Sequence, residues 1–347
     1  MKQSNNQIIK QLPSVSIVIP TLNAEGPLPE CLKRISVQDY PKDKLEIVIA
    51  DGGSTDKTVE IAKKFGARVV PNKLKTGEAG KAAGVKAAKG EIVALVDSDN
   101  YLPGRTWLKE MVAPFADPEV IGSEPIEYTY RKSDGYITRY CALIGMNDPI
   151  CLFLGNYDRW NYLIGKWTGL TVKSSDQGDW LKLELEKYKV PTIGANGTMI
   201  RRSLIKNQIN DYLFDIDEIY ALMEKGKNKF AKVNVGIIHV FSGTVRTFIR
   251  KQKRRIKDYA YYQKLGVRKY PWSKLNKIGF IKFVLYSALW LPTFGQAAIG
   301  YAKKPDMAWF FHPLACWLTL WVYGTSRIGQ LIFGARELNR AGWKQKF

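Results

Sequence analysis

The sequence predicts an α/β protein whose core is a mostly parallel β-sheet covered by helices on both faces. Two observations support this fold class. Short apolar runs alternate with helix-like segments over residues 1–110, and this order is typical of βαβ units. Polar residues follow three of the apolar runs directly, as they do at the carboxyl edge of parallel sheets, where ligands bind.

Each predicted element of this first region has its own local signal. The strands are short apolar runs rich in β-branched residues, at residues 14–20, 45–50, 67–70 and 91–97. The helices between them have helical spacing or helix-favouring composition, at residues 26–37, 55–65 and 78–89. A strand, a turn and a helix follow again from residue 191, and the acidic start of a further helix lies within residues 211–226.

Residues 111–190 are harder to assign, because they are aromatic and carry semi-apolar runs such as YCALIGM and ICLFLGNY. One interpretation is a compact core segment. The other is a surface that faces a membrane or binds an acceptor.

Two long apolar runs lie near the C-terminus. Residues 278–301 contain one charged residue, Lys282, and residues 307–326 contain none. About 20 apolar residues are enough to span a bilayer, so we expect a hairpin of two apolar membrane helices within residues 278–333. Prolines interrupt both runs, and two lysines lie between them. A re-entrant or interfacial hairpin, or an ordinary core, therefore remains an alternative.

The net charge of +21 indicates an anionic partner. Residues 246–277 carry twelve lysines or arginines and a single acid, Asp258. Because this stretch lies beside the apolar runs, it favours an anionic membrane surface, and no nucleic-acid-binding module is recognised. We therefore expect a catalytic domain over residues 1–245, a basic amphipathic juxtamembrane segment over 246–277, the hairpin, and a basic tail over 334–347.

Two polar strand ends carry candidate chemistry. Asp97, Ser98 and Asp99 follow the fourth strand, and the two carboxylates should point to the same side. Such hard oxygen ligands suit Mg²⁺ or Mn²⁺, which commonly bridge a diphosphate. Asp51 precedes two glycines and is placed to accept hydrogen bonds from a base or ribose. Both stretches also have good turn composition, so surface turns are the alternative.

Three stretches together resemble the family 2 glycosyltransferases of the GT-A fold: SIVIPTLNAEGPLPECLKRI, IVIADGGSTDKT and GEAGKAAGVKAAKGEIVALVDSDN. The resemblance covers residues 1–110 closely and implies a nucleotide-diphosphate sugar donor, with UDP expected before GDP. It assigns donor binding to Pro20, Leu22, Asn23, Asp51, Lys81, Asp97, Ser98, Asp99, Gln252 and Arg255. It assigns the metal, Mn²⁺ or Mg²⁺, to Asp97, Asp99 and His239.

The same resemblance implies a general base at the start of a helix. Asp215 has the family spacing to Leu222 and Gly226, and Asp217 and Glu218 are its rivals. The function expected is that of an inverting, metal-dependent glycosyltransferase at the cytoplasmic face of the cell membrane, with a lipid-linked or glycan acceptor. A catalytically impaired membrane scaffold of the same fold is the first alternative, and a basic nucleic-acid-binding protein is the second.

Overall fold

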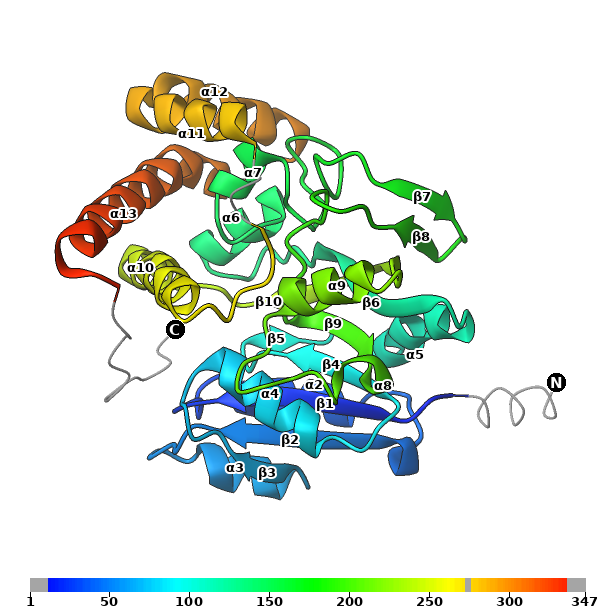
Figure 1. Ribbon diagram of the computed structural model, residues 1–347. Coiled ribbons are helices and arrows are strands. Elements are labelled where there is room, and N and C mark those ends of the chain that lie inside the picture. The colour runs from blue at the N-terminus through cyan, green and yellow to red at the C-terminus, as the bar shows by residue number, and fades with distance from the viewer. Residues whose placement is uncertain (1–11, 272–275, 336–347) are drawn as a thin grey trace.

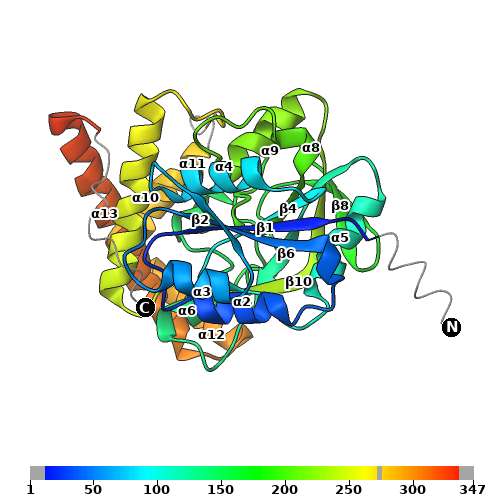
Figure 2. The same cartoon turned by 90° about the horizontal axis from the view of Figure 1, so that it is seen from below.

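The computed structural model describes residues 12–271 and 276–335, and it confirms the α/β class. A ten-stranded sheet has the order β3-β2-β1-β4-β9-β6-β10-β8-β7, with β5 paired to β10. Helices cover both of its faces, as Figure 1 and Figure 2 show. The strands are β1 (Val15–Thr21), β2 (Leu45–Asp51), β3 (Arg68–Pro71), β4 (Ile92–Val96), β5 (Asn100–Tyr101), β6 (Val120–Tyr128), β7 (Lys173–Asp176), β8 (Trp180–Glu184), β9 (Asn196–Arg201) and β10 (Lys229–His239).

The helices fall into those that lie between strands in the chain and those that follow the last strand. The first group is α2 (Leu28–Ser36), α3 (Thr58–Lys64), α4 (Gly77–Ala87), α5 (Trp107–Val112), α6 (Tyr136–Ile144), α7 (Ile150–Leu154), α8 (Arg202–Ile205) and α9 (Asp215–Glu224). The second group is α10 (Val245–Lys264), α11 (Lys277–Leu289), α12 (Leu291–Lys303) and α13 (His312–Phe333). The strands and helices predicted for residues 1–110 are all present.

The sheet is mixed, not mostly parallel as the sequence predicted. Strands β3, β2, β1 and β4 are parallel to one another, and β6 is parallel to β10. Strand β9 is antiparallel to both β4 and β6, and β8 and β7 add antiparallel pairings at the far edge. The βαβ signals lie in the first third of the chain, so they carry no information on how the later strands insert.

The alternating side chains of β1 enter two separate cores. Ile17 and Ile19 pack in one core with α2 and α5. Val18 packs in the other core with α4 and α9. Because successive strand residues point to opposite faces, this central strand joins the two helical layers seen above and below the sheet in Figure 2.

The aromatic middle of the chain forms a third core. Tyr140, Leu143 and Ile144 of α6 are fully buried there, together with Trp309 from the C-terminal region. For this stretch the core interpretation is confirmed.

The C-terminal region is not a simple hairpin of two helices. The first apolar run breaks at Trp290, whose φ is +62°, into α11 and α12, which are bent by 95°. Pro292 explains the break, because proline lacks an N–H and its ring clashes with the preceding helical turn. Within the described residues no single helix is long and apolar enough to cross a membrane, although α11 and α12 together meet the length and composition required. Most of the predicted basic tail, residues 336–347, lies outside the described residues.

Gly84 provides a test of how closely α4 packs on β1. A Cβ at this position would lie 2.2 Å from Val18 Cγ1. We expect Gly84→Ala to lower the free energy of unfolding by about 1–3 kcal/mol, the usual effect of overpacking a core. Gly77→Ala is the matched control, because it lies in the same helix and its Cβ would contact nothing within 4 Å. Equal urea midpoints for the two variants would contradict this packing.

Candidate active site

A cavity of about 250 Å³ lies at the carboxyl edge of the parallel strands, between the ends of β1 and β4 and helix α10. Eight residues predicted from the sequence line it: Pro20, Leu22, Lys81, Asp97, Ser98, Asp99, His239 and Arg255. Five other predicted residues lie outside this lining: Asn23, Asp51, Gln252, Asp215 and Asp217. The structure therefore brings most of the predicted donor and metal residues together, but not the predicted bases.

Asp51 and Asn23 hold the loops beside the cavity. The Asp51 carboxylate accepts hydrogen bonds from the backbone N–H groups of Gly53 and Ser54, at 2.9 and 2.8 Å. The Asn23 side-chain oxygen accepts one from the Thr55 N–H at 2.8 Å. These bonds join the loops that follow β1 and β2, so both residues shape the cavity wall. The contact predicted between Asp51 and the donor stays a prediction.

Asp99 lies among charged groups. Its Oδ2 is 3.2 Å from Lys251 Nζ, and its Oδ1 is 3.7 Å from His239 Nε2. Burial alone would raise the pKa of Asp99, but the charges of Lys251 and His239 hold it below its ordinary value. At neighbouring Asp97, burial and the charge of Asp99 raise the pKa to about 7.

The donor atoms around Asp99 fit a divalent cation that shares its coordination with a bound ligand. Burial lowers the pKa of His239 to about 4, so its imidazole is neutral and able to bind a metal at physiological pH. Among the described residues, no three His, Cys, Asp or Glu side chains lie close enough together to hold a metal by themselves. Asp99 and His239, with Asp97 beside them, would thus supply part of the coordination, and ligand phosphates commonly supply the rest.

Helix α10 forms the cationic wall of the cavity. Arg250, Lys251, Arg254 and Arg255 all line it. They form two pairs four positions apart, 250 with 254 and 251 with 255, and residues at this spacing lie on the same side of a helix. The segment expected to face a membrane therefore also faces the donor cavity. The spacing of these four basic residues can be recognised in the sequence, although only Arg255 was predicted as a site residue. Gln252 is buried and donates to the backbone oxygen of Asn147 at 2.9 Å.

The predicted base Asp215 is separated from the cavity by Lys81, which lines the cavity. Its Oδ2 is 2.5 Å from Lys81 Nζ, and both side chains are nearly buried. Burial raises the pKa of Asp215, although the charge of Lys81 opposes that rise. The Oδ1 atom of Asp215 is buried and has no hydrogen-bond partner among the described residues. One oxygen of this carboxylate is therefore available for a further contact.

The two rival carboxylates face away from the cavity. Asp217 Oδ2 accepts hydrogen bonds from Arg268 at 2.7 and 3.0 Å, and its Oδ1 accepts bonds from the backbone N–H groups of Lys269 and Tyr270. Glu218 lies 3.2 Å from Lys269 Nζ. Asp217 thus ties α9 to the segment that follows α10.

Sequence reasoning missed two asparagines that line the cavity, Asn147 and Asn196. Asn147 lies in the loop after α6, and its side chain is 3.2 Å from the His239 ring. Asn196 begins β9 and donates to the Tyr128 hydroxyl at 2.9 Å. No local pattern marks either residue, because both reach the site through tertiary contacts.

The Asp217 contacts generate a stability prediction. Asp217→Asn removes the charge opposite Arg268, and breaking a buried ion pair from one side typically costs about 3–5 kcal/mol. We expect a loss near the lower limit, about 3 kcal/mol, because asparagine can still accept one hydrogen bond. Asp39→Asn is the control: it breaks an exposed pair with Lys109, and urea denaturation should show little change. If Asp217→Asn unfolds at the wild-type midpoint, the anchoring role is refuted.

Comparison with known proteins relates part of the chain to one family. Residues 16–165 match the model of glycosyl transferase family 2. The glycosyltransferase AglE of Haloferax volcanii is 29% identical over 143 residues, which are 39% of this chain and 46% of that protein. The dodecaprenyl-phosphate galacturonate synthase of Rhizobium johnstonii is 33% identical over 183 residues, 49% of this chain and 47% of that protein. Each match thus covers less than half of the relative's length.

Among solved structures, the mannosyltransferase PcManGT from Pyrobaculum calidifontis, in complex with GDP-Man and Mn²⁺, aligns with a TM-score of 0.54. The alignment covers 94% of this chain and 89% of that one at 18% identity, and it supports the shared fold. One conclusion follows from the mixed sheet, the cavity at its carboxyl edge and the family match over residues 16–165. Residues 16–165 match glycosyl transferase family 2, and the chain shares the fold of that mannosyltransferase.

Proposed function

We propose that the protein is an inverting, metal-dependent glycosyltransferase that moves a sugar from a nucleotide-diphosphate donor to a lipid-linked acceptor at a membrane surface. The observation that carries this proposal is the cavity in which Asp97, Asp99 and His239 face the cations of α10. Acidic metal ligands on one wall and arginines on the opposite wall are the groups that bind a diphosphate.

The chain's own residues would bind and orient the donor. Arg255 is held in place by Asp148, at 3.3 Å from Arg255 Nη1 to Asp148 Oδ2, so its guanidinium is oriented before any ligand arrives. Lys251 already neutralises part of the charge on Asp99. A divalent cation, held by Asp99 and His239 with Asp97 nearby, would offset the negative charge on the departing diphosphate.

Asp215 is the proposed general base. In an inverting transfer the acceptor oxygen bonds to the anomeric carbon as the nucleoside diphosphate leaves, and the acceptor hydroxyl loses its proton. Burial raises the pKa of Asp215, and its Oδ1 has no hydrogen-bond partner within the described part of the chain. Both properties suit a carboxylate that accepts this proton. Lys81 holds Asp215 from the cavity side, so this ion pair must loosen for the transfer.

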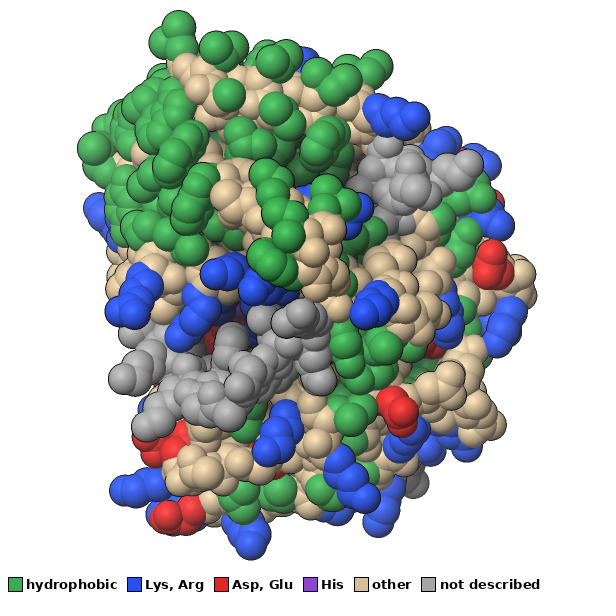
Figure 3. Space-filling view, turned by 60° about the vertical axis from the view of Figure 1, so that its left-hand side comes forward, with side chains coloured by type: hydrophobic (Ala, Val, Ile, Leu, Met, Phe, Trp, Pro, Cys, Tyr) green, Lys and Arg blue, Asp and Glu red, His purple; other side chains and the backbone are tan. Residues whose placement is uncertain are grey.

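The membrane part of the proposal rests on the C-terminal helices. Figure 3 shows hydrophobic side chains gathered over the upper part of the molecule, where Figure 1 places α11, α12 and α13, with lysines and arginines below them. Within the described residues, the most exposed large apolar side chains are Ile278, Leu289, Leu291, Met307, Leu331, Ile332 and Phe333. A contiguous apolar surface bordered by cations is typical of proteins that bind anionic lipid.

Contacts at both ends of the α11–α12 pair favour an interfacial position over a spanning one. Lys303 Nζ donates to the Leu163 backbone oxygen at 2.5 Å. Lys304 lies 3.6 Å from the centre of the Tyr162 ring. At the other end, Gly279 near the start of α11 packs closely against the backbone of Phe153, and further along the helix the rings of Phe153 and Phe283 lie 5.5 Å apart. Because both ends contact the catalytic domain, we propose that the pair lies in one leaflet, parallel to the membrane.

Donor binding tests the enzymatic proposal. We expect purified protein to bind UDP or GDP in isothermal titration only when Mn²⁺ is present. Asp99→Asn should weaken that binding by at least about tenfold, since loss of even a supporting residue of a metal site commonly has this effect. Asp176→Asn, on the exposed strand β7, is the control. No binding of either nucleotide by folded wild type would favour the scaffold alternative.

The same preparations separate binding from chemistry at Asp215. Asp215→Asn should keep donor binding and lower sugar transfer by about 10²–10⁴-fold, the usual contribution of a general base. Transfer is measured as release of nucleoside diphosphate with a membrane lipid extract as acceptor. Full turnover by this variant would remove the base role and favour a phosphate acceptor, which needs little help from a base.

Vesicle binding tests the apolar surface. Ile281→Glu combined with Leu285→Glu places two charges on the exposed face of α11. We expect co-sedimentation with phosphatidylglycerol vesicles to fall at least about tenfold, because burying each apolar side chain contributes about 1.5–3 kcal/mol. Val37→Glu, at an equally exposed position beyond α2, should bind as wild type does. Unchanged binding of the double variant would refute the interfacial position of α11.

A further inference from the structure

His239 can bind a metal through Nε2 only if its other ring nitrogen carries the hydrogen. The structure orients the ring with Nε2 toward Asp99 Oδ1, at 3.7 Å. Nδ1 points the opposite way and lies 3.2 Å from the Asn147 side-chain atom assigned as the nitrogen Nδ2. In a neutral imidazole one nitrogen donates and the other accepts. The group beside Nδ1 therefore decides which nitrogen is available to a cation.

We infer that Asn147 is a positioning residue that sets the tautomer of His239, by presenting its amide oxygen to Nδ1–H. This inference rests on the proposed function, because it concerns a proposed metal ligand. A half-turn about the terminal torsion exchanges the amide oxygen and nitrogen with little change in shape. The assigned orientation has Nδ2 facing His239, while Oδ1 is buried with no hydrogen-bond partner among the described residues. The half-turn puts the oxygen 3.2 Å from Nδ1 instead, and the choice between the two orientations depends on the surrounding hydrogen bonds.

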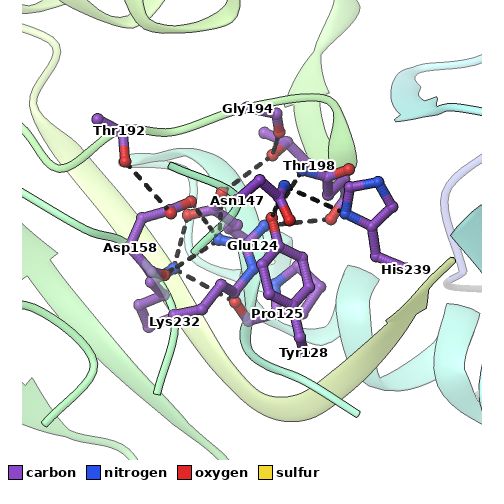
Figure 4. A network of polar contacts seen from close by, with 12 residues as sticks. Glu124, Pro125, Tyr128, Asn147, Asp158, Thr192, Gly194, Thr198, Lys232 and His239 are labelled. Carbon is purple, nitrogen blue, oxygen red and sulfur yellow. Dashed lines mark hydrogen bonds and ion pairs between the residues drawn. The ribbon is translucent and has the colours of Figure 1, made fainter. Parts of the chain in front are cut away.

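The Tyr128 hydroxyl favours the oxygen. The same Asn147 amide atom that faces His239 lies 3.1 Å from the Tyr128 hydroxyl, which also accepts a hydrogen bond from Asn196 at 2.9 Å. With that bond received, the hydroxyl needs an acceptor for its own hydrogen. An oxygen of Asn147 at this position accepts from both Tyr128 and His239, and Figure 4 shows the three side chains converging there.

The distance to Asp99 favours the same tautomer. A hydrogen on Nε2 would be directed at an oxygen 3.7 Å away, which is beyond hydrogen-bond range. A hydrogen on Nδ1 has a partner at 3.2 Å. The bonded tautomer leaves the Nε2 lone pair directed at the Asp99 carboxylate, where a divalent cation would be held by both.

Two supports keep Asn147 in place. Its backbone oxygen accepts a hydrogen bond from Gln252 of α10 at 2.9 Å. This bond holds the main chain of Asn147 against the cationic helix. Tyr128 is fixed from the other side by Arg159, whose guanidinium carbon lies 5.4 Å from the ring centre. Because the anchoring bond to α10 uses the main chain, replacing the Asn147 side chain leaves it intact.

Nitrogen NMR of the full-length wild-type protein tests the inference without any variant. The chain contains two histidines, and His312→Gln removes the other signal and assigns the spectrum. With ring-¹⁵N-labelled histidine at pH 8, we expect His239 to carry its hydrogen on Nδ1. A hydrogen found mainly on Nε2 overturns the inference.

Metal affinity provides a second test, with Mn²⁺ followed by its EPR signal in the presence of UDP or GDP. Asn147→Leu removes the acceptor and should weaken Mn²⁺ binding about 10–100-fold. Asn147→Asp keeps an acceptor in the same place and should retain wild-type affinity or exceed it. Equal or tighter binding by Asn147→Leu, or equal losses in both variants, overturns the inference. If wild type binds no Mn²⁺ with either nucleotide, the metal-dependent function fails, while the NMR result still decides the tautomer.

Discussion

The buried ion cluster of Glu124, Arg159, Lys232 and Asp158 is the contact on which the arrangement of the site depends. Lys232 Nζ lies 2.7 Å from Glu124 Oε2, and Arg159 Nη1 lies 2.6 Å from Glu124 Oε1. These three side chains are at most 1% exposed, so removing one charge would leave another without a partner in a medium where that is costly. The cluster joins β6, β10 and the loop after α7, and Figure 4 shows it beside Tyr128 and His239.

Helix α10 connects the cavity to the apolar surface. Its cationic side chains line the cavity, and its other face packs against α13. Tyr323 of α13 donates a hydrogen bond to Asp148, which also pairs with Arg255. A lipid-linked acceptor held at α11–α13 would thus lie next to the residues proposed to bind the donor. In the proposed arrangement the net charge of +21 would favour binding of both the diphosphate and an anionic lipid surface.

Several site residues could be identified from the chain because their signals are local. Asp97 and Asp99 follow an apolar strand, whereas Lys81 was assigned through the resemblance of its segment to the family motif. The roles of Asp215 and Asp217 could not be separated in this way, since both begin one helix. Their difference comes from Lys81 and Arg268, which lie 134 and 51 residues away in the chain.

By itself, the sequence determined the α/β class, the family motifs and the parallel half of the sheet, because periodicity and strand-end residues are properties of short segments. Only the tertiary structure decided that β9 inserts antiparallel between β4 and β6 and that α10 faces the cavity. It also decided that Asn147 meets His239 across 92 residues of chain, and that the first apolar run bends at Trp290 with both ends on the domain. These features arise from packing between distant segments, which leaves no periodic trace along the chain.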